Sequence, residues 1–200
     1  MLRLLFILLL FTHIVLGDRC KNLVQEVRRA HYLAFGVDFP YWYGVGQLKQ
    51  ESGCRDVISK DGVGSRGVAQ ITYRVWQKFL KKRGINNINT ISNQIHAQAY
   101  IMKQCKLEAY TSHLWGAYMV YNGGHIVNKE IIRARKKYHI REVPYCIAKE
   151  FCKRKIIEFN NGQSISACKI AYDYPKKIYI YGQQYKPFNI NEKEFRYIFW

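Results

Sequence analysis

Residues 50–72, QESGCRDVISKDGVGSRGVAQIT, hold the features that decide the fold and the candidate site. The stretch begins with a single acid, Glu51, which follows the apolar and aromatic run of residues 39–48. It continues through a loop rich in glycine and short polar residues and ends where a new helical pattern starts at Gly67. A carboxyl group at the end of an apolar helix is a candidate general acid, because burial disfavours its charged form and raises its pKa. Most Glu residues at helix ends are solvated surface residues, so the motifs around Glu51 decide between the two interpretations.

Four short motifs follow one another along the chain: ESG from Glu51, GVAQ from Gly67, VYNGG from Val120 and EVPY from Glu142. In this order they resemble the ES, GLMQ, AYNAG and E-x-x-Y elements of the lytic transglycosylases with an SLT domain, which are related to goose-type lysozymes. The loop VISKDGVGSRG is also similar to the family's AVSPAGARG, with one extra residue. The resemblance covers approximately residues 38–158 and leaves both ends of the chain unexplained.

The resemblance implies a peptidoglycan lytic transglycosylase in which Glu51 is the single catalytic acid and base, with no metal and no cofactor. The family's substrate-binding positions correspond to Ser52, Gln70, Tyr121, Asn122 and Tyr145. Gln70 would bind the sugar or its acetamido group from the start of a helix, and Tyr121 would reach Glu51 or the acetamido group through its hydroxyl. Ser52 would shape the surroundings of the acid, Asn122 would bind sugar or fix a turn, and Tyr145 would close the groove wall. Val68 and Ala69 replace the family's Leu-Met, which trims the apolar floor of the groove.

The number of carboxylates separates the possible functions. Glycoside cleavage usually needs two carboxylates, although substrate-assisted hydrolases are an exception, and only Glu51 occupies a catalytic position of the family. A hydrolytic lysozyme of the same fold, in which Asp56 or Asp61 positions a water, is the first alternative. A non-catalytic module that binds cell wall or nucleic acid is the second. The motif residues argue against this module, whereas the basic charge argues mildly for it.

The charge balance indicates a polyanionic partner. The chain of 200 residues carries 32 Lys and Arg against 14 Asp and Glu, a formal net charge of +18, which attracts polyanions over long distances. We expect peptidoglycan glycan strands as the partner, and a secretion, conjugation or phage-entry apparatus is a further candidate. We do not expect nucleic acid or a small-molecule cofactor.

The first residues are typical of a targeting segment. Arg3 supplies a positive end, and the apolar run of residues 4–16 is too short to span a bilayer comfortably. We expect residues 1–17 to be a signal peptide cleaved before Asp18, with an uncleaved membrane anchor as the alternative. The protein would then be exported, to the periplasm or the extracellular space. An even set of six cysteines in an oxidising compartment favours disulfides and no free thiols in the mature protein.

The periodicity of apolar residues predicts a mainly α fold, and with the resemblance it indicates a lysozyme-like helical domain with a substrate groove. Residues 18–160 would form this domain, and residues 161–200 a C-terminal arm packed on it. Within the arm, the alternation over residues 178–188 predicts a short β-hairpin or extended segment. The helices are expected at residues 21–35, 40–52, 67–82, 90–107, 112–122, 126–138 and 143–159.

Overall fold

Helices dominate the computed structural model, which describes residues 18–59, 64–109, 113–140, 143, 145–152, 156–158 and 162–188, with the backbone alone at 123–126, 145 and 157. The prediction of a mainly α fold is therefore confirmed. Within the described ranges, no helix combines the length and the apolar character needed to cross a membrane. The predicted signal peptide, residues 1–17, lies outside the described residues. The elements are η1 Arg19–Leu23, α1 Val24–Phe35, α2 Trp42–Ser52, α3 Tyr73–Lys81, α4 Ile91–Glu108, α5 Leu114–Tyr138, α6 Tyr145–Phe151, β1 Ile156–Glu158, β2 Ser164–Ser166 and α7 Ala167–Gln183.

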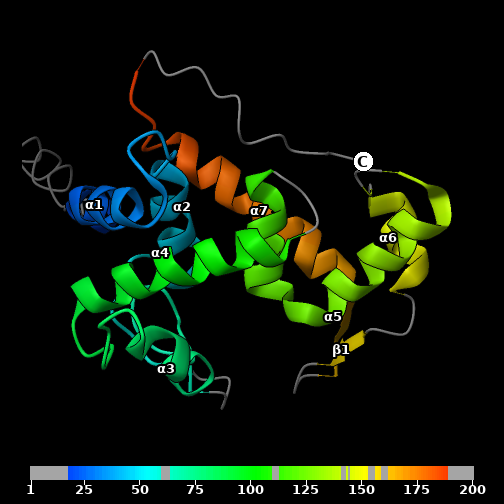
Figure 1. Cartoon of the computed structure of the whole chain (residues 1–200), viewed down its shortest axis with the longest axis horizontal. Coiled ribbons are helices and arrows are strands. Elements are labelled where there is room, and N and C mark those ends of the chain that lie inside the picture. The colour runs from blue at the N-terminus through cyan, green and yellow to red at the C-terminus, as the bar shows by residue number, and fades with distance from the viewer. Residues whose placement is uncertain are drawn as a thin grey trace, which may run out of the picture.

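Helix α2 packs against α1 and α7, while α4 and α5 pack against each other (Figure 1). Side chains are buried on every side of α2 from Trp42 to Leu48, as expected for a helix with apolar residues all round. Glycines allow α2 and α7 to approach closely, because a Cβ at Gly46 would lie 2.6 Å from the backbone nitrogen of Gly182. The helix ends at Gly53, whose left-handed φ of 63° suits a C-cap glycine.

The hairpin predicted for residues 178–188 is wrong, because these residues continue α7 as far as Gln183. The buried positions of α7, which include Cys168, Ala171, Tyr174 and Ile178, recur at helical spacing. Ile180, in contrast, is about half exposed, so the Tyr-Ile alternation does not describe two faces of a strand. The short antiparallel pair lies earlier, between β1 and β2. Residues 189–200 of the predicted arm lie outside the described residues.

Three predicted helix boundaries also need correction. The Asn122-Gly123-Gly124 sequence does not stop α5, which continues to Tyr138. Two glycines in a helix cost about 1 kcal/mol each, and the packing of α5 against α4, α6 and α7 outweighs this preference. Helix α3 begins at Tyr73 instead of Gly67, and α6 ends at Phe151, where the chain leads to β1.

Two disulfides join cysteines that are 34 and 16 residues apart in the chain. Cys20 bonds Cys54, which fastens η1 to the end of α2, and Cys152 bonds Cys168, which fastens the end of α6 to the start of α7. All six cysteines are described, and the remaining two are unpaired: Cys105 is buried in α4 and Cys146 is exposed on α6. The prediction that the protein has no free thiol is therefore wrong in this structure, although the prediction of disulfides is confirmed.

Candidate active site

Glu51 lies in the last turn of α2, where its side chain is only partly exposed. One carboxyl oxygen, Oε1, accepts a hydrogen bond from the hydroxyl of Tyr174 on α7. Burial raises the pKa of Glu51 from 4.5 to about 7, and the hydrogen bond from Tyr174 opposes this rise. A carboxyl group with a pKa near neutrality exchanges a proton readily at physiological pH, as a general acid or base must.

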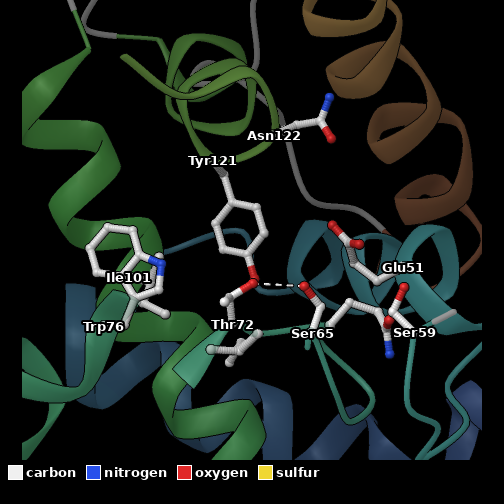
Figure 2. A pocket seen from close by; sticks show the side chains of 10 residues that line it. Glu51, Ser59, Ser65, Thr72, Trp76, Ile101, Tyr121 and Asn122 are labelled. Carbon is white, nitrogen blue, oxygen red and sulfur yellow. Dashed lines mark hydrogen bonds between the residues drawn. The ribbon is translucent and has the colours of Figure 1, made fainter. Parts of the chain in front are cut away.

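A cavity of about 430 Å³ opens beside this carboxyl group, a volume within the range of small-molecule sites. Figure 2 shows Glu51 at one side of the cavity and Trp76 at the other, with Tyr121 between them. Hydroxyl and amide groups supply much of the lining, and the hydroxyls of Ser65 and Thr72 bond each other at 2.7 Å. The lining residues are Glu51, Ser59, Ser65, Gln70, Ile71, Thr72, Trp76, Ile101, Tyr121 and Asn122.

Gln94 of α4 holds the chain between α2 and α3 through hydrogen bonds to Asp56 and Val68. The Oε1 atom of Gln94 accepts from the backbone N–H of Val68 at 2.8 Å, and its Nε2 donates to Asp56 at 3.0 Å. Gly67 is required next to this clamp, because its φ is +84° and an added Cβ would lie 2.3 Å from the side-chain amide carbon of Gln94. The buried Ser52 donates to the carbonyl of Val68 at 2.8 Å, which ties the loop to the end of α2.

The structure brings Gln70, Tyr121 and Asn122 to the same cavity as Glu51. Gln70, however, lies in a turn with a φ of +47° before α3, so its expected place at a helix start is wrong. Its amide nitrogen donates to the carbonyls of Val57 and Gly67, at 2.9 and 2.8 Å. Asn122 lies within α5, exposed on the cavity side, where it fixes no turn.

Tyr121 does not bond Glu51, which is one of the two partners expected for it; a contact with a substrate acetamido group stays a prediction. Its hydroxyl donates to the carbonyl of Ala69 at 3.0 Å, whereas the hydroxyl on Glu51 belongs to Tyr174. Ser52 is buried and joins two chain segments, and it is not among the residues described as lining the cavity. Tyr145 begins α6, but its side chain lies outside the described residues, as does all of Asp61.

Sequence reasoning missed Tyr174, the hydrogen-bond partner of Glu51, and part of the cavity wall. Tyr174 belongs to the segment after residue 160, which carries no motif, and it comes within reach of Glu51 only because α7 crosses α2. Trp76 was part of an expected helix, and no sequence signal distinguished its ring from a core aromatic residue. The short polar residues Ser59, Ser65 and Thr72 flank the second motif, so the enrichment of hydroxyls around GVAQ was the one available signal.

No family model matches the chain, and neither the curated proteins nor the solved structures contain a match to it. Within the described ranges there is no group of three or more His, Cys, Asp or Glu side chains placed to hold a metal ion. The site offers one carboxyl group that can both give and take a proton, and a polar cavity with one broad aromatic wall at Trp76.

Proposed function

We propose that the protein is an exported peptidoglycan lytic transglycosylase with Glu51 as its single general acid and base. The observation that carries this proposal is the partly buried Glu51 carboxyl, with a pKa of about 7, at the wall of a polar cavity. Among the described lining residues, Glu51 is the one carboxylate. A lone acid–base residue suits a reaction in which the substrate itself supplies the nucleophile.

In the proposed reaction, protonated Glu51 gives its proton to the oxygen of the β-1,4 bond between N-acetylmuramic acid and N-acetylglucosamine. The bond from C1 of the muramic residue to this oxygen breaks, and the substrate's acetamido oxygen stabilises the positive charge that develops at C1. Glu51, now a carboxylate, takes the proton from the C6 hydroxyl while the C6 oxygen bonds C1. The products are a 1,6-anhydro end and a free 4-hydroxyl, with no water consumed and Glu51 protonated again.

The cavity lining fits a carbohydrate of this kind. The side chains of Ser59, Gln70, Thr72 and Asn122 offer hydrogen-bonding groups for hydroxyl and acetamido substituents. The ring of Trp76 offers an apolar face against which the C–H groups of a pyranose can pack. This lining is more polar than that of a typical small-molecule site, which suits a ligand rich in hydroxyl groups.

Two observations favour this proposal over its alternatives. For a hydrolytic lysozyme, Asp56 or Asp61 would position a water; Asp61 lies outside the described residues, and the Asp56 carboxylate accepts a hydrogen bond from Gln94 and is not among the described cavity-lining residues. For a non-catalytic module, there would be no reason to keep a carboxyl group buried enough to shift its pKa to about 7. The two disulfides and the net charge of +18 agree with export and with an anionic wall polymer as the partner.

The deciding experiment compares wild-type protein with Glu51→Gln on purified cell wall. We expect the variant to lose wall lysis by a factor of ~10²–10⁴, which is the usual contribution of general acid–base catalysis. Mass spectrometry of the wild-type products should show 1,6-anhydro ends; reducing ends would identify a hydrolase. Glu26→Gln, a carboxyl substitution outside the cavity, is the matched control and should leave lysis unchanged. If Glu51→Gln keeps more than about a tenth of the wild-type rate, the assignment of Glu51 is wrong.

A further inference from the structure

A series of buried polar side chains connects α4 to the candidate acid Glu51 through hydrogen bonds. Gln98 on α4 and Gln47 on α2 are both fully buried. The Nε2 atom of Gln98 donates to Oε1 of Gln47 at 2.7 Å, and Nε2 of Gln47 donates to the hydroxyl of Tyr174 at 3.2 Å. Tyr174, also buried, donates in turn to Oε1 of Glu51. The four side chains thus connect three helices in one hydrogen-bonded series.

The donor-to-acceptor direction of this hydrogen-bonded series is fixed at Gln98, the member that is farthest from Glu51 along the series. Besides its bond to Gln47, Nε2 of Gln98 donates to the backbone carbonyl of Gly44 at 3.1 Å. A carbonyl oxygen can only accept, so the amide nitrogen of Gln98 must lie on this side. Its second N–H then requires an acceptor, which is Oε1 of Gln47, and the amide nitrogen of Gln47 therefore faces Tyr174.

The hydroxyl of Tyr174 has one donor and two acceptor positions. Since Gln47 presents an N–H to it, Gln47 cannot accept the phenolic proton. The partner that the structure gives this proton is Oε1 of Glu51. A buried hydroxyl without an acceptor is unfavourable, so the proton stays directed at Oε1 whether Glu51 is charged or neutral.

We propose that Gln47 and Gln98 are positioning residues that hold Tyr174 as a hydrogen-bond donor to Oε1 of Glu51. Because Oε1 accepts this bond in both protonation states, the proton of neutral Glu51 resides on Oε2. The series therefore selects which carboxyl oxygen gives and takes the proton. The part that concerns Tyr174 and Oε1 stands on the geometry alone, whereas the consequence for proton transfer to a glycosidic oxygen rests on the proposed function.

The electrostatic surroundings of Glu51 make the proposal measurable. The ionisable groups that act on it from the neighbouring helices are Tyr174 on α7 and Tyr121 on α5. Burial, and after it the charge of Glu51, raises the pKa of both phenols well above the ordinary value. Lys49, on the same helix as Glu51, is directed to Gln184, Tyr185 and Asp18. Neither phenol ionises while Glu51 titrates, so a change in the Glu51 pKa reports on the hydrogen bond from Tyr174.

The test is a titration of Glu51 by NMR, in protein labelled with ¹³C at the glutamate side-chain carboxyl carbons and assigned by comparison with Glu51→Gln. A hydrogen bond to the charged form lowers a carboxyl pKa, so Tyr174→Phe should raise the pKa of Glu51 by ~1 unit or more. Gln47→Met, which fills similar volume without a donor, should raise it by ~0.3 unit, as expected for a bond weakened by up to about 30%. Met102→Leu, a buried change one turn along α4 from Gln98, is the control and should leave the pKa unchanged.

The double variant Gln47→Met/Tyr174→Phe gives the sharper result. If Gln47 acts through Tyr174, the double variant has the Glu51 pKa of Tyr174→Phe alone, because residues in one network are not additive. Additive shifts, or a Gln47→Met pKa equal to that of wild type, overturn the proposal. If Gln47→Met does not fold, Gln98→Met answers the same question, with a smaller expected shift in the same direction. The titration needs no substrate, so it can fail or succeed independently of the proposed function.

Discussion

Replacing Glu51 with Gln should make the protein more stable at neutral and alkaline pH while it removes activity. Burial raises the pKa of Glu51 from 4.5 in the unfolded chain to about 7 in the folded one. Between these values the folded state binds more protons, so the free energy of unfolding falls as the pH rises from 4.5 and levels off above 7. A shift of about 2.5 units corresponds to about 3 kcal/mol. Partial exposure of the side chain makes this an upper limit, and we expect ~1–3 kcal/mol.

The measurement is thermal unfolding followed by circular dichroism at several pH values. At pH 8 we expect Glu51→Gln to unfold about 2–12 °C above the wild type, since 1 kcal/mol shifts the midpoint of a domain of this size by about 2–4 °C. Near pH 4 the two proteins should unfold together, because the wild-type carboxyl is then protonated in both states. Equal midpoints at every pH would show that Glu51 is solvated and that its burial does not shape its chemistry.

A control substitution at Glu26 should give the opposite sign. Burial raises the pKa of Glu26, but hydrogen bonds from Ser92 and Arg29 outweigh burial and lower it below 4.5 overall. Such a carboxylate stabilises the folded state above the unfolded pKa, and this contribution is lost as the pH falls. Glu26→Gln should therefore be less stable than the wild type at pH 7 and approach it in acid. The two substitutions thus distinguish Glu51, whose ionised carboxyl group destabilises the folded state at neutral pH, from Glu26, whose ionised carboxyl group stabilises it.

Three further predictions test other parts of the structure. Thiol titration of denatured, unreduced protein should find two thiols per chain, Cys105 and Cys146; none would indicate a third disulfide. Gly67→Ala should destabilise the protein by ~1–3 kcal/mol through overpacking against Gln94, and more than Gly64→Ala, which has a similar φ but open space; equal losses in urea unfolding would contradict the clamp. Sedimentation with insoluble wall should show binding that weakens from about 0.1 M to 1 M salt, as the screening length falls from ~10 Å to ~3 Å; binding that is flat with salt would assign the charge of +18 another role.

The parts of the fold that could be predicted are those in which local pattern and packing agree. Helix α2 followed from the apolar run before Glu51, and α4 followed from a long helical pattern that begins at Thr90. In α5 the local pattern and the packing disagree. The glycines at 123 and 124 favour the end of a helix, while the buried positions continue through Val127, Ile131 and Ala134. Burial of these positions against neighbouring helices decides the outcome, and the sequence of one segment does not contain this information.

In the candidate site too, some residues could be predicted from local motifs and others could not. Glu51, Gln70, Tyr121 and Asn122 lie in motifs, and the structure brings them to one cavity. The residues behind Glu51 could not be predicted, because they depend on contacts between segments far apart in the chain. Tyr174 lies 123 residues from Glu51 and 127 from Gln47. A glutamine inside an apolar helix has no local signature that separates a buried hydrogen-bonding role from a solvated one.

The two disulfides have a place in this arrangement, because they hold the two helices that carry the long-range pair. Cys54 follows Glu51 by three residues and fastens the end of α2 to η1, while Cys168 precedes Tyr174 by six residues and fastens the start of α7 to α6. Each bridge restricts the chain beside its helix, mainly in the unfolded state. A carboxyl group whose burial destabilises the fold above its pKa favours states in which it reaches water. Because neither bridge joins α2 to α7, the packing of these two helices against each other and the hydrogen bond from Tyr174 keep Glu51 away from water.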